Sequence, residues 1–173
     1  KKHTFSLEQK KTIPVLKSCG YILFEDVYSP INMPPFRQSA MDGYAISGHR
    51  DEIYTVINEI KAGDAHHPTL KLGEAVRIFT GAAVPETANA VIMQEQVTVE
   101  GQKIRIKKTI STNENIRPLG EQIKKGEIAL KKGAKLTPAA IGYLSSLGIT
   151  KISVCKKPTI AIVVTGDELV EAG

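Results

Sequence analysis

Short stretches of β-branched and apolar residues alternate with turn-forming residues through the middle of the chain. The stretches that predict strands are residues 53–60, 74–79, 90–94 and 98–107. The last of these divides around Glu100-Gly101, which predicts a hairpin. Because turn signals recur about every ten residues from 38 to 117, this block predicts a small β barrel or sandwich.

A helical pattern stands out after Pro118. Thr137 is typical of an N-cap, Pro138 fits the first helical position, and Gly148 fits the end of the helix. The apolar positions that share one face of this helix are Ala140, Ile141, Leu144 and Leu147. Residues 151–155 then predict a strand.

The two ends of the chain carry weaker patterns. Residues 15–19 predict a short helix that starts with Pro14 and stops at Gly20, and residues 21–27 predict a strand or an extended arm. Residues 159–165 form an apolar run that is typical of a strand buried in a parallel sheet.

The residues after this run resemble the first turn of an α/β domain, with Asp167 and Glu168 in the turn. Each further parallel strand needs a crossover of about a dozen residues or more, and the sequence stops at Gly173. We therefore expect the chain, which starts at Lys1 and not at Met, to end just inside a third domain.

Composition narrows the class of protein. The net charge of +5 comes mostly from lysines, but aromatic residues are not interleaved with them as a nucleic-acid stacking platform requires. No apolar run approaches the roughly 20 residues that span a membrane, and no signal peptide opens the sequence. Cys19 and Cys155 are far apart, which favours a reducing compartment, so we expect a cytoplasmic protein.

Candidate chemistry concentrates in residues 34–45, where two prolines precede an Asp-Gly pair. Such a sequence predicts a stiff loop that presents the Ser39 hydroxyl, the Asp42 carboxylate and the Tyr44 phenol together. A plain hairpin turn, in which Asp42 bonds to its own backbone, fits the same residues. Met41 and Tyr44 are interpreted as packing residues.

The wording of this stretch, Ser-Ala-Met-Asp-Gly-Tyr-Ala after a proline-rich entry, resembles the signature of the molybdopterin molybdenumtransferase family, whose relatives include the C-terminal domain of gephyrin. The resemblance covers essentially the whole chain but about the front half of the family's usual length. The other matching segments, in the family's order, are residues 77–82, 90–95, 115–121, 137–138, 147–148 and 164–169.

The resemblance implies a β-rich α+β fold. Residues 1–37 and 118–157 would form one discontinuous scaffold and dimerisation domain, and residues 38–117 an inserted β-rich domain. Residues 158–173 would begin a truncated α/β domain that binds molybdopterin.

The resemblance also implies a reaction, in which molybdate is inserted into adenylylated molybdopterin with Mg²⁺ and AMP is released. The expected partners are a second copy of the chain, the protein that makes adenylylated molybdopterin, and molybdoenzymes or their chaperones. The isolated chain is expected to be inactive. A non-catalytic dimerisation or protein-anchoring module of the same fold is the alternative.

For the reacting groups, the resemblance places Asp42 at the metal or the substrate oxyanion, and a carboxylate suits Mg²⁺. Thr80 is expected to line the same cleft, and the amides around Gly81 could cradle an oxyanion. Ser39 either binds the ligand or closes the turn. Glu168 is either catalytic or complements a helix dipole.

The segment 117–122 is expected to contact the ligand as well. Arg117 can bind phosphate through two parallel hydrogen bonds. Gln122 stands where the family usually has aspartate, so this copy lacks a negative charge and a strong Mg²⁺ ligand there. Glu95 is interpreted as an exposed strand end, and His66-His67 as a solvated loop and not a metal site.

Overall fold

The computed structural model describes residues 9–48, 52–64, 68–107, 109–163, 165–166, 168 and 170. The chain divides into two compact units, one formed by residues 1–28 and 128–173 and the other by residues 29–127. The linking segments 29–37 and 118–127, which the sequence analysis gave to the discontinuous unit, fall in the second unit. They do so because they bond to each other, as when Met33 N donates to Ile123 O at 2.9 Å.

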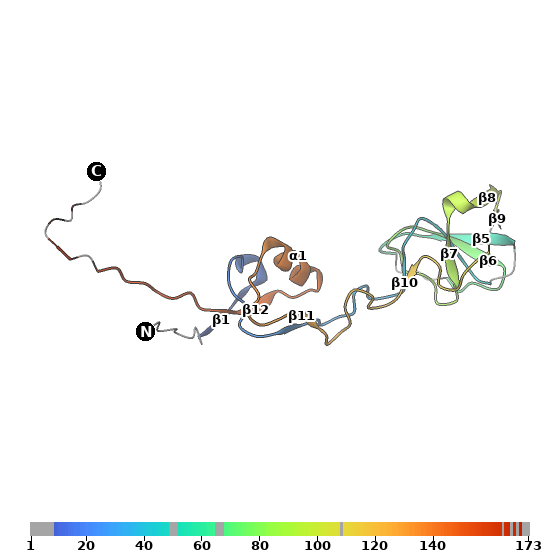
Figure 1. The fold of residues 1–173 in the computed structure, drawn as a ribbon. Coiled ribbons are helices and arrows are strands. Elements are labelled where there is room, and N and C mark those ends of the chain that lie inside the picture. The colour runs from blue at the N-terminus through green and yellow to red at the C-terminus, as the bar shows by residue number, and fades with distance from the viewer. Residues whose placement is uncertain are drawn as a thin grey trace. The chain divides into compact units, whose positions relative to one another are not determined.

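The second unit is built on a six-stranded sheet with the order β7-β4-β6-β5-β9-β8. Strands β5 to β9 of this sheet are labelled in Figure 1. Its strands are β4 (Gly43–Ile46), β5 (Ile53–Ile60), β6 (Glu74–Ile78), β7 (Ala90–Met93), β8 (Val97–Glu100) and β9 (Lys103–Ile106). The 3-10 turn η2 (Gln94–Gln96) joins β7 to β8, and β3 (Gln38–Ser39) pairs with β10 (Ile116–Arg117). The predicted β-rich block is confirmed, but its main sheet is a single mixed sheet with edge strands β7 and β8.

The strand directions bring one terminus of each of four strands to the same end of this sheet. Strands β5 and β6 are parallel, whereas β4 is antiparallel to both β6 and β7. Strands β5, β6 and β7 therefore finish at the end of the sheet where β4 starts. Asp42, Thr80, Gln94 and Lys61 each lie within two residues of those strand ends.

Both faces of the sheet are covered, because side chains along β4, β6 and β7 alternate between two apolar clusters. One cluster contains Ala45, Ile60, Val76, Ile78 and Val91, and the other contains Ile46, Tyr54, Ala75, Ala90 and Ile92. Burial on both sides explains the nearly continuous apolar character of these short strands.

The first unit joins strands from both ends of the chain. Strand β1 (Lys10–Pro14) pairs with β12 (Lys151–Cys155), and β2 (Val27–Tyr28) pairs with β11 (Ile128–Leu130). Their apolar side chains pack with helix α1 (Pro138–Ser146) around buried Leu23, Leu136 and Leu144. No helix in the described part of the chain is long and apolar enough to cross a membrane.

Several sequence predictions for this unit are confirmed. Helix α1 starts with Pro138 after the N-cap Thr137, whose Oγ1 accepts a hydrogen bond from Ala140 N at 3.2 Å. Residues 151–155 form the predicted strand. The predicted N-terminal helix is only the 3-10 turn η1 (Val15–Lys17), since Pro14 instead ends β1.

Two predictions differ from the structure. Residues 43–46 form the interior strand β4, although the prolines and the Asp-Gly pair predicted a loop over the whole stretch 34–45. Residues 159–163 are exposed and form no strand, in contrast to the predicted buried strand. No described strand lies beside that run to pair with its backbone, so neither burial nor a ladder stabilises it there.

Candidate functional site

The Asp42 carboxylate is held by Thr80. Thr80 N donates to Asp42 Oδ1 at 2.7 Å, and Thr80 Oγ1 donates to the same oxygen at 2.8 Å. The contact follows from the pairing of Gly43 with Ile78, which brings the start of β4 beside the end of β6. Among the described residues, Asp42 Oδ2 accepts no hydrogen bond. The plain-turn interpretation, with Asp42 bonded to its own backbone, is therefore wrong.

These contacts keep the carboxylate charged. The Thr80 backbone N–H holds the pKa of Asp42 below its ordinary value, and the Thr80 hydroxyl lowers it further. Desolvation opposes this shift, and the charge of Arg77 makes the smallest contribution to lowering the pKa. Asp42 is exposed, and it is a carboxylate at neutral pH. The site thus presents a fixed negative charge with one oxygen open to a ligand.

Arg77 joins three segments beside this carboxylate. Its Nη1 donates to Gly43 O at 3.0 Å, and its Nη2 donates to Gln94 Oε1. The guanidinium carbon lies 5.1 Å from the centre of the Tyr44 ring and 4.9 Å from that of Phe79. Tyr44 is the cross-strand partner of Arg77, and Phe79 follows two residues later.

The backbone beside Asp42 is closely packed against β7. A Cβ on Gly43 would lie 1.9 Å from the carbonyl oxygen of Ile92, so only glycine allows β4 to approach β7 this closely. Gln94 N donates to Asp42 O at 3.1 Å from the end of β7. Asp42 is therefore positioned by strands on both sides of β4.

Ser39 and Gly81 are neighbours in the structure. Ser39 is buried, its Oγ donates to Met41 O at 2.7 Å, and so its hydroxyl closes the turn. Gly81 adopts a φ of +89° and its N donates to Ser39 O at 2.9 Å. The amides of Thr80, Gly81 and Ala82 all donate to partners within the chain, so they are not free to cradle an oxyanion.

In the second unit, no hydrogen bond is described between Asp42 or Thr80 and the predicted site residues Arg117 and Gln122. Arg117 is exposed opposite Gln38, and Gln122 has an exposed side chain while its backbone N donates to Met33 O at 2.9 Å. Glu168 is exposed and belongs to the first unit. Asp167, His66 and His67 lie outside the described residues.

Of the residues interpreted as structural, Tyr44 is half-buried and packs against an apolar cluster, as predicted. Met41 is 41% exposed, so its interpretation as a packing residue is wrong. Glu95 is exposed, also as predicted.

The second unit also has an open pocket of about 520 Å³ that contains neither Asp42 nor Thr80. Its lining residues include Phe36, Arg37, Val84, Pro85 and Leu119. The Arg37 guanidinium donates to the carbonyl oxygens of Pro85, Glu86 and Ala88, so it serves the fold here. Within the described ranges, three or more His, Cys, Asp or Glu side chains never gather as a metal-binding group.

The chain is similar to known proteins in sequence and in fold. The family model described as the MoeA N-terminal region (domain I and II) matches residues 1–148. The chain belongs to this MoeA family. The resemblance to molybdopterin molybdenumtransferases is thereby confirmed.

Individual MoeA relatives agree with the family match. The chain is 40% identical over 169 residues to a molybdopterin molybdenumtransferase of Haemophilus influenzae, and 39% identical over 163 residues to one of Staphylococcus epidermidis. These matches cover 95% and 90% of the chain but 42% and 39% of the relatives. The crystal structure of the molybdopterin biosynthesis MoeA protein of Pyrococcus horikoshii matches with a TM-score of 0.89 at 39% identity, over 95% of this chain and 46% of that one. The chain thus spans less than half the length of these MoeA relatives.

Sequence reasoning gave no role to Arg77 or Gln94, although both stand within the matching motifs. A signal was present, because Arg77 alternates with the apolar residues Ala75 and Phe79 and lies between the apolar residues Val76 and Ile78 of β6. A charged residue at such a position needs specific partners.

Proposed function

We propose that this chain is part of a molybdopterin molybdenumtransferase that inserts molybdate into adenylylated molybdopterin and releases AMP. The observation that carries the proposal is the Asp42 carboxylate, kept charged by Thr80 through Oδ1 while Oδ2 accepts no hydrogen bond among the described residues. The names of the MoeA relatives support the same chemistry.

Mg²⁺ fits this carboxylate. Mg²⁺ is usually held by one or two carboxylates together with substrate phosphates and waters, so a single exposed aspartate is a sufficient protein ligand. When bound there, Mg²⁺ would supply charge stabilisation to a phosphate oxygen. The chain's own part is to fix one oxygen of Asp42 through Thr80 and to keep that carboxylate ionised.

The remaining candidates have supporting roles in this proposal. The exposed guanidinium of Arg117 would bind a phosphate, and Gln122 would offer an amide in place of a negative charge. Ser39 and Gly81 would hold the backbone that carries Thr80, and Glu168 stays a separate candidate for a catalytic carboxylate. A homodimer in the cytoplasm, exchanging ligands with the adenylylating protein and with molybdoenzymes or their chaperones, completes the proposal.

The test is molybdate insertion by the natural gene product that carries this sequence. Asp42→Asn should lower the rate about 100-fold or more, because it removes the carboxylate that would hold Mg²⁺ beside the reacting phosphate. The matched control is Asp26→Asn, since Asp26 also accepts one backbone N–H, from Lys132 at 2.7 Å, but in the first unit. Full activity in Asp42→Asn would contradict the proposal.

The second candidate function is a non-catalytic dimerisation or anchoring module. It is favoured by Gln122, which stands where the family usually has aspartate. Gln122→Asp should raise insertion if the missing charge limits the reaction. A gene product that inserts no molybdate with either residue would favour the module instead. The isolated 173-residue chain is expected to show no turnover.

A further inference from the structure

We propose that Arg77 is a positioning residue that holds Asp42 in place against Thr80 and keeps the open carboxylate oxygen available for a ligand. The proposal deepens the proposed function, because it concerns the same carboxylate. The contacts that carry it nevertheless belong to this chain alone, so they can be tested without any turnover.

The first step is the number of segments that Arg77 ties together. It stands on β6, donates to Gly43 O at the start of β4, and donates to Gln94 Oε1 just beyond β7. Gly43 directly follows Asp42, and Gln94 N donates to Asp42 O at 3.1 Å. The Arg77 guanidinium therefore bonds to two residues that are attached to Asp42. Gly43 follows it in sequence, and Gln94 donates its backbone N–H to the Asp42 carbonyl oxygen.

The second step is the fixed orientation of the guanidinium. Tyr44 and Phe79 flank it with ring centres at 5.1 and 4.9 Å, which suits the flat face of an arginine. Gln94 Nε2 donates to Glu95 Oε1 at 3.1 Å, so the amide of Gln94 turns its oxygen towards Arg77. A lysine has neither the planar face nor the two parallel donors to reproduce these contacts.

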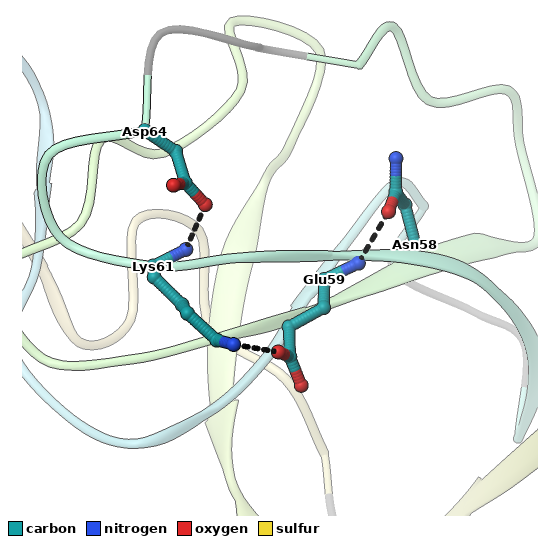
Figure 2. A network of polar contacts seen from close by, with 4 residues as sticks. All are labelled: Asn58, Glu59, Lys61 and Asp64. Atoms are coloured by element: carbon teal, nitrogen blue, oxygen red, sulfur yellow. Dashed lines mark hydrogen bonds and ion pairs between the residues drawn. The ribbon is translucent and has the colours of Figure 1, made fainter.

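The third step is that Glu59, which is in register with Arg77 on β5, pairs with another cation. Lys61 Nζ lies 3.0 Å from Glu59 Oε1, as Figure 2 shows. Among the described residues, the hydrogen bonds of the Arg77 guanidinium go instead to Gly43 O and Gln94 Oε1, on either side of Asp42.

The experiment follows the Asp42 carboxyl by ¹³C NMR in the whole 173-residue chain, together with the Thr80 amide shift. The variants are Arg77→Gln and Arg77→Lys, with Arg105→Gln as a control because Arg105 pairs with Glu100 elsewhere on the sheet. We expect the pKa of Asp42 to rise in Arg77→Gln and the Thr80 amide to lose much of its response to the Asp42 titration. Arg77→Lys should keep part of the pKa effect but lose the amide response.

An Asp42 pKa and a Thr80 response that stay unchanged in folded Arg77→Gln would overturn the inference. If Arg77→Gln fails to fold, Gln94→Met removes one anchor of Arg77 while leaving its charge, and it should weaken the Thr80 response. An unchanged response in Gln94→Met would overturn the inference equally.

Turnover then separates this inference from the proposed function. Arg77→Lys in the natural gene product should lower molybdate insertion roughly 10- to 100-fold, as expected for a small misplacement of a reacting group. If Asp42→Asn keeps full activity while Arg77→Gln still shifts the Asp42 titration, the proposed function fails and the positioning role stands. If Asp42→Asn is inactive while Arg77→Gln changes neither titration nor turnover, the positioning role fails alone.

Discussion

Two sets of carboxylate contacts lie at the same edge of the six-stranded sheet, and they are built differently. Asp42 bonds to Thr80, 38 residues further along the chain, whereas Lys61 bonds to Glu59 and Asp64 close by in sequence (Figure 2). Lys61 N donates to Asp64 Oδ2 at 2.7 Å within the turn that follows β5. The Asp42 contact requires β4 and β6 to be paired, and the Lys61 contacts require only the local turn.

The Asp42 contact therefore depends on the pairing of the strands, whereas the Lys61 contacts do not. The Lys61 and Glu59 side chains are largely exposed, and exposed ion pairs of this kind contribute little to stability. Asp42 is equally exposed, but its partners are fixed by strands on both sides. Perturbing the sheet should therefore affect Asp42 strongly and the Lys61 turn weakly.

Replacing Gly43 should have the largest effect. In Gly43→Ala the new Cβ meets the Ile92 carbonyl oxygen at 1.9 Å, so β4 or β7 must move, at a cost of about 3 kcal/mol. Urea unfolding should show the loss, and hydrogen exchange should place it in β4 and β7. Gly142→Ala in α1 is the matched control, because open space surrounds Gly142 and alanine should stabilise the helix by about 1 kcal/mol. Equal stability of the two variants would contradict the prediction.

Lowering the pH should reduce the free energy of unfolding through protonation of Asp42. Because the pKa of Asp42 is lowered in the folded state, the carboxylate contributes stability above its unfolded pKa, and that contribution is lost as pH falls through the lower folded pKa. Asp42→Asn should remove this part of the acid dependence. Urea unfolding between about pH 2 and 6 measures it, and parallel curves for wild type and Asp42→Asn would rule the contribution out.

Removing the Thr80 hydroxyl should have a smaller effect than removing the charge. Thr80→Val loses the Oγ1 contact at 2.8 Å but keeps the backbone N–H at 2.7 Å, which is the larger cause of the lowered pKa. The pKa of Asp42 should rise but stay below its ordinary value, as ¹³C NMR would show. Thr55→Val, on the exposed surface of β5, should leave the Asp42 pKa unchanged.

Removing the Lys61 partner should have the smallest effect. The hydrogen bond and charge of Glu59 raise the pKa of Lys61, so Glu59→Gln should lower it towards the ordinary lysine value. The stability linked to Lys61 is present at neutral pH and is lost only as pH rises through the raised folded pKa. NMR of the lysine side chain checks the shift. A clear loss of stability at neutral pH would show that this turn matters more than its exposure indicates.

The elements that could be predicted from the sequence are those whose conformation is set by residues close together in the chain. The hairpin of β8 and β9 turns at residues 101–102, where Glu100-Gly101 predicted it, and α1 starts at the cap that Thr137 and Pro138 predicted. Each depends on residues a few positions apart. Asp42 could be singled out from its motif for the same reason.

The parts that sequence missed have causes distant in the chain. Strand β4 was predicted as a loop because two prolines precede it and an Asp-Gly pair stands at its start, and its pairing with β6 and β7 overrides that preference. The bonds from Thr80 to Asp42, and from Arg77 to Gln94, join segments whose proximity follows from the strand order. The strand order cannot be deduced from the pattern of neighbouring residues in the sequence.

The ends of the inserted unit lie side by side, since Ser29 N donates to Glu127 O at 2.8 Å. If residues 29–127 fold first, they clamp the two halves of the other unit at neighbouring points. Closing a flexible loop of about 100 residues costs roughly 4 kcal/mol of chain entropy, and a prefolded insert removes most of that cost. An insert that folds first would thus lower the entropic cost of pairing β1 with β12 and β2 with β11 in the other unit.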